Sequence, residues 1–253
     1  SMSASNMTAT RYMKLLAHVP ILLVDKPDDI LVVCFGTGQT TGAAGIHPRV
    51  KTVDSVELSS SVINAGKMFA DQNHNVLANP KVNFVIQDGR NHLLTTHKLY
   101  DVITSEPPPP RTAFTVNLYT REYYELQKSK LKPGGIVTQW IPLHSQGPKE
   151  VAMHFKTFQS VFPFTMGWLS VANEMIIIGS IQPIKIDFNK LNERVQEPEI
   201  KKALANIEIP NIYSFLSNIW LLNEQVEKLG EGFPLITDNH PAIEFYLNLG
   251  KVI

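Results

Sequence analysis

Three acidic residues follow apolar runs that have the length and composition of buried strands. Glu57 closes the run KTVDSVE, Asp88 comes after KVNFVIQ, and Glu106 comes after LYDVITS. Parallel strands of a doubly wound sheet end at one edge, and that edge forms the ligand crevice. We therefore expect the three carboxylates to surround one cleft. There a carboxylate can accept hydrogen bonds from ribose hydroxyls, receive an adenine amine, or take a proton from an attacking group.

A glycine-rich turn precedes Glu57 in the segment ILVVCFGTGQTTGAAG, residues 30–45. Glycines let the chain turn tightly and let backbone N–H groups approach a ligand closely. A dinucleotide fingerprint needs a glycine at position 41, where this chain has Thr41, so the spacing favours a sulfonium nucleoside of the S-adenosyl type. The alternative is a βα turn that only packs a helix on a strand. The residues expected to contact the nucleoside are Gly36, Thr37, Gly38, Gln39, Glu57, Leu58, Asp88 and Gly89.

Glu106 is the candidate catalytic residue because four prolines, Pro107 to Pro110, follow it directly. Prolines restrict themselves and the preceding residue to extended backbone, so this carboxylate is expected to be held stiffly at a strand tip. Beside a sulfonium it could stabilise positive charge, attract a cationic amine, or accept that amine's proton. The alternative is a solvated acid in a proline-rich loop. Gln139 and Trp140 end the next strand and are expected on the second substrate's side, although core packing of Trp140 is an equal alternative.

Short β-rich runs alternate with helical periodicity up to about residue 179, which predicts an α/β fold. We expect a doubly wound, mainly parallel, seven-stranded Rossmann-like sheet of the S-adenosylmethionine-dependent methyltransferase type. Its strands are expected at 30–35, 52–57, 82–86, 100–105, 135–140, 165–171 and 174–179. Residues 1–28 are expected to form a tail and a lead-in helix, and 29–180 the nucleoside-binding domain. Residues 181–253 are expected to add helices and a final strand to that same domain.

Composition excludes several classes of function. With 23 basic and 23 acidic residues the chain has no electrostatic footprint for nucleic acid. Its lone Cys34 falls inside the predicted first strand as a small buried thiol, and no histidine has metal-ligand spacing, so we expect no disulfide and no metal. Apolar runs are too short for a membrane helix, which needs about 20 residues. A soluble protein of a reducing, cytoplasmic compartment is the expectation.

With those residues in view, the sequence resembles the polyamine aminopropyltransferases, the spermidine synthase family, along nearly all its length. It is most similar to the bacterial branch in which such a domain follows a membrane-embedded region. The resemblance is therefore consistent with a chain that forms the cytoplasmic domain of a membrane protein. The matching segments are RYMKLLAHVPILL, VVCFGTGQTTGAAG, VDSVELSSSV, QDGRNHL, YDVITSEPPPP, LYTREYYELQKSKLKPGGIVTQW and TDNHPAIEF.

The resemblance implies aminopropyl transfer from decarboxylated S-adenosylmethionine to an amine acceptor, with methylthioadenosine released. It places Glu57 on the ribose, Asp88 at the adenine and Gln139 near the acceptor. Glu106 falls where the family has its catalytic aspartate. Tyr12 is the remnant of a Tyr-His-Glu motif and belongs to the acceptor side.

Departures from the family pattern concern the acceptor half. Pro109 stands where the family has the second acid of a D-x-x-D loop, and the tyrosine-bearing loop after the sixth strand reads WLSVANE. The family's N-terminal β-hairpin domain has no counterpart in this sequence. Two alternatives therefore remain open: a methyltransferase that uses intact S-adenosylmethionine, and a non-catalytic nucleoside-binding domain with a degraded polyamine site.

Overall fold

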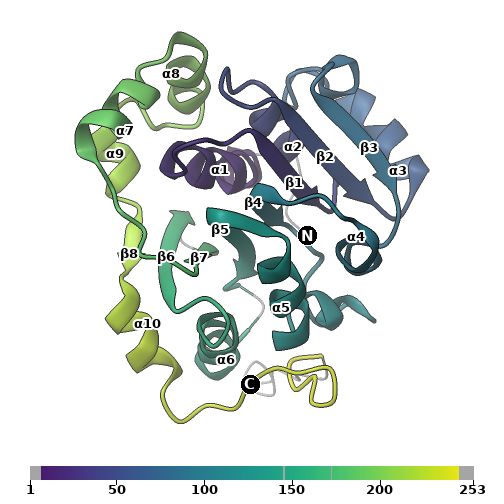
Figure 1. The fold of residues 1–253 in the computed structure, drawn as a ribbon, viewed down its shortest axis with the longest axis vertical. Helices are drawn as coiled ribbons and strands as arrows, with labels where there is room; N and C mark the ends of the chain where they lie inside the picture. The colour runs from purple at the N-terminus through teal and green to yellow at the C-terminus, as the bar shows by residue number, and fades with distance from the viewer. Residues whose placement is uncertain (1–6, 145, 172, 245–253) are drawn as a thin grey trace, which may run out of the picture.

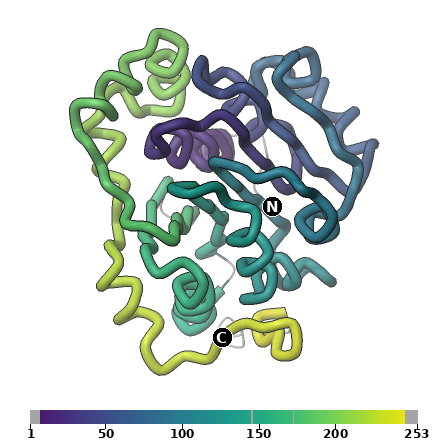
Figure 2. The backbone as a smooth tube through the Cα atoms, in the orientation of Figure 1, coloured from purple at the N-terminus to yellow at the C-terminus, as the bar shows by residue number. Residues whose placement is uncertain are grey.

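The computed structural model describes residues 7–144, 146–171 and 173–244 of the chain. They fold around one eight-stranded sheet with strand order β3-β2-β1-β4-β5-β7-β6-β8. Helices cover both faces of this sheet (Figures 1 and 2). The α/β class predicted from the sequence is confirmed, with eight strands rather than seven.

The first half of the sheet is parallel. It contains β1 (Asp29–Val33), β2 (Thr52–Glu57), β3 (Val82–Ile86), β4 (Tyr100–Ser105) and β5 (Leu131–Pro142). The second half is antiparallel, with β6 (Phe164–Val171), β7 (Glu174–Ser180) and β8 (Ile219–Leu221). The chain order reverses beside β1, where β2 lies on one side and β4 on the other. Ligands of such sheets bind at this switch point.

Successive residues of the central strands point to opposite faces of the sheet and contribute to two separate hydrophobic cores. One face packs against α1 (Met7–Leu23), α2 (Gln39–Gly45), α7 (Phe188–Val195), α8 (Pro198–Ala205) and α9 (Ile212–Leu216). The other packs against α4 (Gly89–Thr95), α5 (Arg121–Ser129), α6 (Pro148–Gln159) and α10 (Asn223–Gly230). A short helix, α3 (Ser60–Ala65), lies beside β2 and closes a small third cluster around Phe35.

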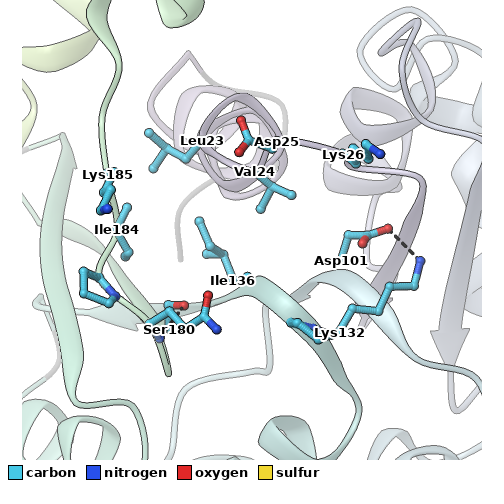
Figure 3. Close-up of a pocket in the computed structure, with 14 residues that line it drawn as sticks. Leu23, Val24, Asp25, Lys26, Asp101, Lys132, Ile136, Ser180, Ile184 and Lys185 are labelled. Carbon is cyan, nitrogen blue, oxygen red and sulfur yellow. Dashed lines mark hydrogen bonds and ion pairs between the residues drawn. The ribbon is translucent and has the colours of Figure 1, made fainter.

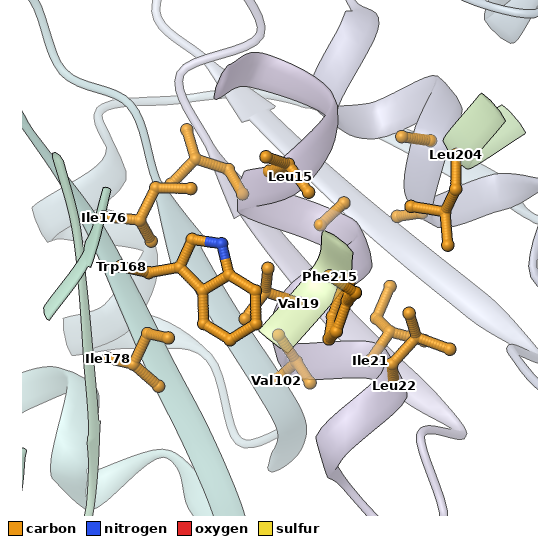
Figure 4. Packing of buried hydrophobic residues seen from close by; sticks show 14 of the residues in the cluster. Leu15, Val19, Ile21, Leu22, Val102, Trp168, Ile176, Ile178, Leu204 and Phe215 are labelled. Atoms are coloured by element: carbon orange, nitrogen blue, oxygen red, sulfur yellow. The ribbon is translucent and has the colours of Figure 1, made fainter. Parts of the chain in front are cut away.

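Helix α1 is the central element of the first core. Its residues are buried almost all round, which is typical of a helix enclosed by the protein. Figure 4 shows Leu15 and Val19 of this helix packed beside Trp168 of β6 and Phe215 of α9. This packing fixes the N-terminal half of α1 next to the carboxyl edge of the sheet, so Tyr12 and Met13 can reach the site described below.

Several predicted boundaries were wrong. The first strand ends at Val33 rather than residue 35, and the fifth extends over Leu131–Pro142 rather than 135–140. The segment 181–253, expected to add helices and one final strand, also contributes the short strand β8, which begins at Ile219. These errors arise because tertiary pairing outweighs local propensity.

Two further expectations concern a final strand and helices that could span a membrane. The segment where a final strand would begin forms a turn at residues 242–244, and residues 245–253 lie outside the described part. Among the described residues, no helix is both long and apolar enough to span a membrane.

Candidate active site

A cavity of about 640 Å³ opens at the carboxyl edge of β1, β2, β3 and β4. This volume suits a small-molecule ligand, for which sites of about 300–1,000 Å³ are usual. Seven of the residues predicted from the sequence line it: Gly36, Thr37, Glu57, Leu58, Asp88, Gly89 and Glu106. The structure therefore brings the three strand-end acids to one cleft, as their positions in the sequence predicted.

Glu57 is held at the tip of β2 by two backbone amides. The N–H of Phe35 donates to Glu57 Oε2 at 3.0 Å, and the N–H of Ser59 donates to Oε1 at 3.2 Å. Each carboxylate oxygen keeps further acceptor capacity toward the cavity. The two backbone hydrogen bonds fix the orientation of the carboxylate at the cavity wall.

Asp88 has a structural role in addition to its place in the cavity wall. It caps α4, because its Oδ1 accepts the N–H of Asn91 at 2.9 Å. Gly89, expected to contact the nucleoside, lines the cavity, and a Cβ there would lie 2.4 Å from Val33 Cγ1. Packing against β1 therefore already requires a glycine at this position.

The glycine-rich turn begins at Cys34, two residues earlier than expected. Cys34 has a φ of 72°, a left-handed conformation that is uncommon for a residue with a side chain. Gly36 and Gly38 follow with φ of 56° and 79°, and a Cβ on Gly38 would lie 2.5 Å from the Phe35 ring. Cys34 is thus outside the strand and lines the cavity, contrary to the prediction of a thiol buried in β1. Burial raises the pKa of this thiol above its usual range.

Gly38 and Gln39 do not line the cavity. Gly38 caps α2, and Gln39 is buried in the first turn of that helix, with its Nε2 donating to Thr37 Oγ1 at 3.3 Å. Gly38 and Gln39 therefore stabilise the turn and help to position Thr37.

Glu106 lies at the end of β4 with its carboxylate between two hydroxyl groups. Thr40 Oγ1 lies 3.0 Å from Glu106 Oε2, and the Tyr12 hydroxyl also hydrogen-bonds to this carboxylate. Burial raises the pKa of Glu106 to about 7, against the opposing effect of these hydrogen bonds. Glu106 is therefore a buried carboxyl group with a pKa near neutral pH rather than a solvated surface acid.

The Thr40 hydroxyl also contacts the carbonyl oxygen of Met13, at 2.9 Å. Since a hydroxyl has one hydrogen, it can donate to only one of its two acceptors at a time. If Thr40 donates to Met13, a protonated Glu106 can donate to Thr40, so both protonation states of Glu106 have hydrogen-bond partners. The proline segment beyond Glu106 is also anchored, because the Tyr119 hydroxyl lies 3.2 Å from the carbonyl oxygens of Pro107 and Pro108.

A chain of contacts leads from Glu106 to a second buried acid that the sequence analysis did not identify. The Tyr12 ring stacks on Trp140 with centroids 5.5 Å apart, and Trp140 Nε1 donates to Glu174 Oε2 at 2.6 Å. Glu174 is fully buried, and burial raises its pKa to about 7. Its other oxygen, Oε1, accepts no hydrogen bond within the described residues, and His144 Nδ1 lies 3.5 Å from it, at ion-pair distance.

Glu174 lies in the WLSVANE segment, where it begins β7 opposite Pro142 of β5. The sequence pattern that could have identified Glu174 is an acid placed directly before the apolar run MIIIG. It was missed because only the antiparallel register brings this residue back to the end of β5.

Gln139 is also buried near this end of β5, and it lies opposite Ser105 in the sheet. Within the described ranges, neither its amide oxygen nor its amide nitrogen has a hydrogen-bond partner. Buried polar groups are nearly always hydrogen-bonded to protein or water, so unpaired ones mark places where a polar ligand or water can bind. Gln139, Tyr12 and Trp140 do not line the cavity of about 640 Å³. Tyr12 connects this group to the cavity wall, because its hydroxyl hydrogen-bonds to Glu106 and its ring stacks on Trp140.

The cavity wall contains further residues that sequence reasoning did not select. Met13 of α1 lines it beside Glu106, and Arg90 lines it while pairing with Asp238 of the closing TDNHP segment. Phe114, with a φ of 65°, lines the cavity yet is 83% exposed. Its ring is available to cover an aromatic ligand.

A second cavity, of about 680 Å³, lies at the opposite edge of the sheet, between the end of α1 and the first residues of β4 and β5 (Figure 3). Its main charged groups already have partners, since Lys132 Nζ pairs with Asp101 at 2.9 Å and with Asp29 at 2.6 Å. No histidine lines it. Across the described residues, no three His, Cys, Asp or Glu side chains form a group that could hold a metal ion.

Glu57→Gln is expected to weaken methylthioadenosine binding by about 10–100-fold, since a lost hydrogen bond to a charged group costs about 1.5–3 kcal/mol. The amide nitrogen of the glutamine must face either the Phe35 or the Ser59 N–H, so one backbone bond is lost together with a ribose acceptor. Calorimetric titration measures the change. Glu125→Gln, which alters only an exposed ion pair with Arg121, is the matched control and should bind as the parent does. Equal affinities of the Glu57 variant and the parent would contradict the ribose assignment.

Comparisons with known proteins agree with this geometry. A family model for the spermine/spermidine synthase domain matches residues 9–172. The polyamine aminopropyltransferase of Methanocaldococcus jannaschii is 27% identical over 203 residues, which span 75% of this chain and 68% of that protein. The polyamine aminopropyltransferase of Bacillus cereus is 31% identical over 157 residues, which span 61% of this chain and 56% of that protein.

Solved structures with the same fold include the spermidine synthase from Thermotoga maritima. It has a TM-score of 0.70 and 21% identity, and the match covers 87% of this chain and 75% of that one. Human methyltransferase-like protein 13 in complex with SAH has a TM-score of 0.57 and 20% identity, with 79% of this chain and 91% of that one covered. The strand-end acids, the glycine turn and the family match together confirm the resemblance predicted from the sequence: the chain belongs to the spermine/spermidine synthase family.

Proposed function

We propose that this protein transfers an aminopropyl group from decarboxylated S-adenosylmethionine to an amine, releasing methylthioadenosine. The observation that carries the proposal is Glu106, a carboxylate with a pKa of about 7 at the junction of the nucleoside cavity and the buried acceptor side. An aminopropyltransferase is also the function named for the relatives. The chain spans just over half the length of the Bacillus cereus relative, so the activity is proposed here from its own residues.

The donor would lie with its ribose on Glu57 and its adenine between Asp88 and the exposed Phe114 ring. Its sulfonium would then face Glu106. A positive sulfur stabilises a nearby carboxylate anion, so donor binding should lower the pKa of Glu106 and favour its basic form. An intact S-adenosylmethionine adds a carboxylate, which an ionised Glu106 repels.

The acceptor would enter on the side of Tyr12, Gln139 and Glu174. The buried oxygens Glu174 Oε1 and Gln139 Oε1 accept no hydrogen bond within the described residues, although His144 Nδ1 lies 3.5 Å from Glu174 Oε1. They suit an ammonium group or an amine, which brings hydrogen-bond donors. When ionised, Glu174 supplies a negative charge to the acceptor side, a role that the resemblance assigns to the acid replaced here by Pro109. We propose that it holds the cationic end of the acceptor.

In the reaction, the lone pair of a neutral amine attacks the methylene carbon next to sulfur. The new C–N bond forms as the C–S bond breaks, and the bonding electrons pass to sulfur, giving neutral methylthioadenosine. The amine loses one proton, which Glu106 accepts. Tyr12 and Thr40 keep the carboxylate oriented throughout by hydrogen bonding.

The methyltransferase alternative is favoured only by the shared fold with human methyltransferase-like protein 13. Charge distinguishes the two donors, because ionised Glu106, which lines the cavity, opposes a donor that carries a carboxylate. The non-catalytic alternative predicts nucleoside binding without turnover.

Purified protein given decarboxylated S-adenosylmethionine and a panel of diamines is expected to release methylthioadenosine, which chromatography detects. Calorimetry is expected to show tighter binding of methylthioadenosine and of the decarboxylated donor than of S-adenosylmethionine. Reversed affinities would remove the argument for aminopropyl transfer. Clear nucleoside binding without product from any amine would leave the non-catalytic alternative.

A further inference from the structure

A third cavity, of about 550 Å³, lies between α1, the end of α2, residues 71–81 and α8. Lys14 of α1 lines it, whereas the preceding residue, Met13, lines the nucleoside cavity. Consecutive residues of a helix point about 100° apart, so the two cavities lie on different sides of α1. The third cavity is thus separate from the site proposed for aminopropyl transfer.

Lys14 is an unusual residue for this place, because it is only 5% exposed. Lysine is almost never buried to this extent unless it is paired. Yet no hydrogen bond or ion pair joins its ammonium group to any residue in the described part of the chain. Burial lowers the pKa of Lys14, as expected for a cation without a counterion.

The groups that surround Lys14 do not neutralise it. His74, which lines the same cavity, has a buried Nε2 atom without a hydrogen-bond partner among the described residues. One helical turn beyond Lys14, His18 Nδ1 contacts His47 Nε2 at 2.9 Å, and Lys81 Nζ donates to the carbonyl oxygen of His47 at 2.8 Å. Burial and the charge of Lys14 lower the pKa of His74 to about 4, so it stays neutral at pH 7.

The more buried polar groups of the cavity, here called its floor, are therefore the Lys14 ammonium and the neutral His74 imidazole, and more exposed charged side chains form its rim. Two acids, Asp71 and Glu199, and two lysines, Lys81 and Lys202, make up the charged rim. A single negative charge at the floor would satisfy the Lys14 ammonium and accept a hydrogen bond from His74. A doubly charged anion would be opposed by the two rim acids.

From this arrangement we propose that the cavity is a binding site for a small organic monocarboxylate, held through its carboxylate by Lys14 and His74. Such a ligand supplies the counterion and the acceptor that the buried side chains lack. No group of the nucleoside site takes part.

Acetate is the probe, with sodium chloride holding the ionic strength constant. Acetate is expected to bind saturably, seen as a rise in Tm and as chemical-shift changes at residues of α1 and α8. Lys14→Met keeps the apolar stem and removes the charge, and it should weaken acetate binding at least tenfold. The ligand-free Lys14→Met protein should have a Tm about 2–4 °C higher, because a gain of 1 kcal/mol shifts a domain of this size by about that amount.

Lys149→Met is the matched control, since Lys149 is exposed on α6, at the far end of the molecule from α8 in Figure 1. It should bind acetate as the parent does. Lys14→Gln is a second charge-removing variant, and methylthioadenosine binding checks that either variant is folded. Unchanged acetate affinity in a folded Lys14 variant, or a response to acetate no larger than to chloride, would overturn the proposal. Tighter binding of inorganic phosphate than of acetate would overturn the assignment to monocarboxylates.

Discussion

Glu106→Gln is expected to lower kcat for aminopropyl transfer by about 10²–10⁴-fold, the usual contribution of a general base. The glutamine side chain keeps the size of Glu106 and can still accept from Thr40 or Tyr12, but it cannot take a proton from the amine. Binding of methylthioadenosine should change less than threefold, because the ribose contact on Glu57 is untouched. Steady-state turnover and calorimetric titration of the same preparation measure the two effects separately.

The dependence of activity on pH follows from the same residue. With the pKa of Glu106 raised to about 7 by burial, the free enzyme holds a protonated, inactive Glu106 at lower pH. Parent kcat/KM should therefore fall about tenfold for each pH unit below about 7. Glu106→Gln should lose this acid limb, because its side chain has no proton to lose.

The control for Glu106 is again Glu125→Gln, an equal chemical change on the exposed face of α5. It should retain the parent's kcat and pH profile. Turnover of Glu106→Gln at the parent's rate would show that another group accepts the proton. A gain in S-adenosylmethionine affinity in this variant is also expected, since the repulsion of its carboxylate is removed.

Much of the cleft could be predicted from the sequence because its information is local. Glu57, Asp88 and Glu106 each follow a strand whose apolar run is visible in the sequence, and parallel strands bring their carboxyl ends to one edge. The positive φ of Gly36 and Gly38 likewise follows from glycine's freedom at a tight turn. Thus the fold class and the gathering of the three acids required no knowledge of distant contacts.

The features of the site that could not be predicted depend on contacts between segments that are far apart in the sequence. Cys34 adopts a positive φ that its residue type disfavours, while its backbone N–H donates to Val56 of β2. Glu174 reaches Trp140 only because β7 returns antiparallel beside β5. Lys14 is buried by α2 and α8, elements that follow it by about 25 and 185 positions in the sequence. Neither hydrophobic periodicity nor a short motif predicts such tertiary contacts.

Glu174→Gln is expected to impair acceptor binding, with the amine KM raised by about 10–100-fold if one charge-assisted hydrogen bond of about 1.5–3 kcal/mol is lost. Removing this charge should also lower the pKa of Glu106, which makes it a weaker base that is ionised at lower pH in the free enzyme. The negative charge of Glu174 raises the pKa of Glu106, so removing it should shift the acid limb of kcat/KM to lower pH. Kinetics over a series of amine concentrations and pH values separates the two effects.

The same variant should be more stable than the parent at alkaline pH. Burial raises the pKa of Glu174 from its usual 4.5 to about 7, so the folded state binds the proton more tightly than the unfolded state does. The resulting stability is fully present below pH 4.5 and is lost as the pH rises through about 7, at an order-of-magnitude cost of about 3 kcal/mol. Glutamine avoids this loss, so the Tm of the variant should exceed the parent's at pH 8 by roughly 6–12 °C.

At pH 4 the two proteins should unfold at similar temperatures, because Glu174 is then protonated in both the folded and the unfolded parent. Saturating amine should narrow the difference at pH 8, since a bound cation stabilises the ionised Glu174 of the parent. A variant that is more stable, yet binds the amine poorly, is the pattern of a residue kept for function at the expense of stability. A variant less stable than the parent at pH 8, or with an unchanged amine KM, would instead assign Glu174 to holding Trp140 in the core.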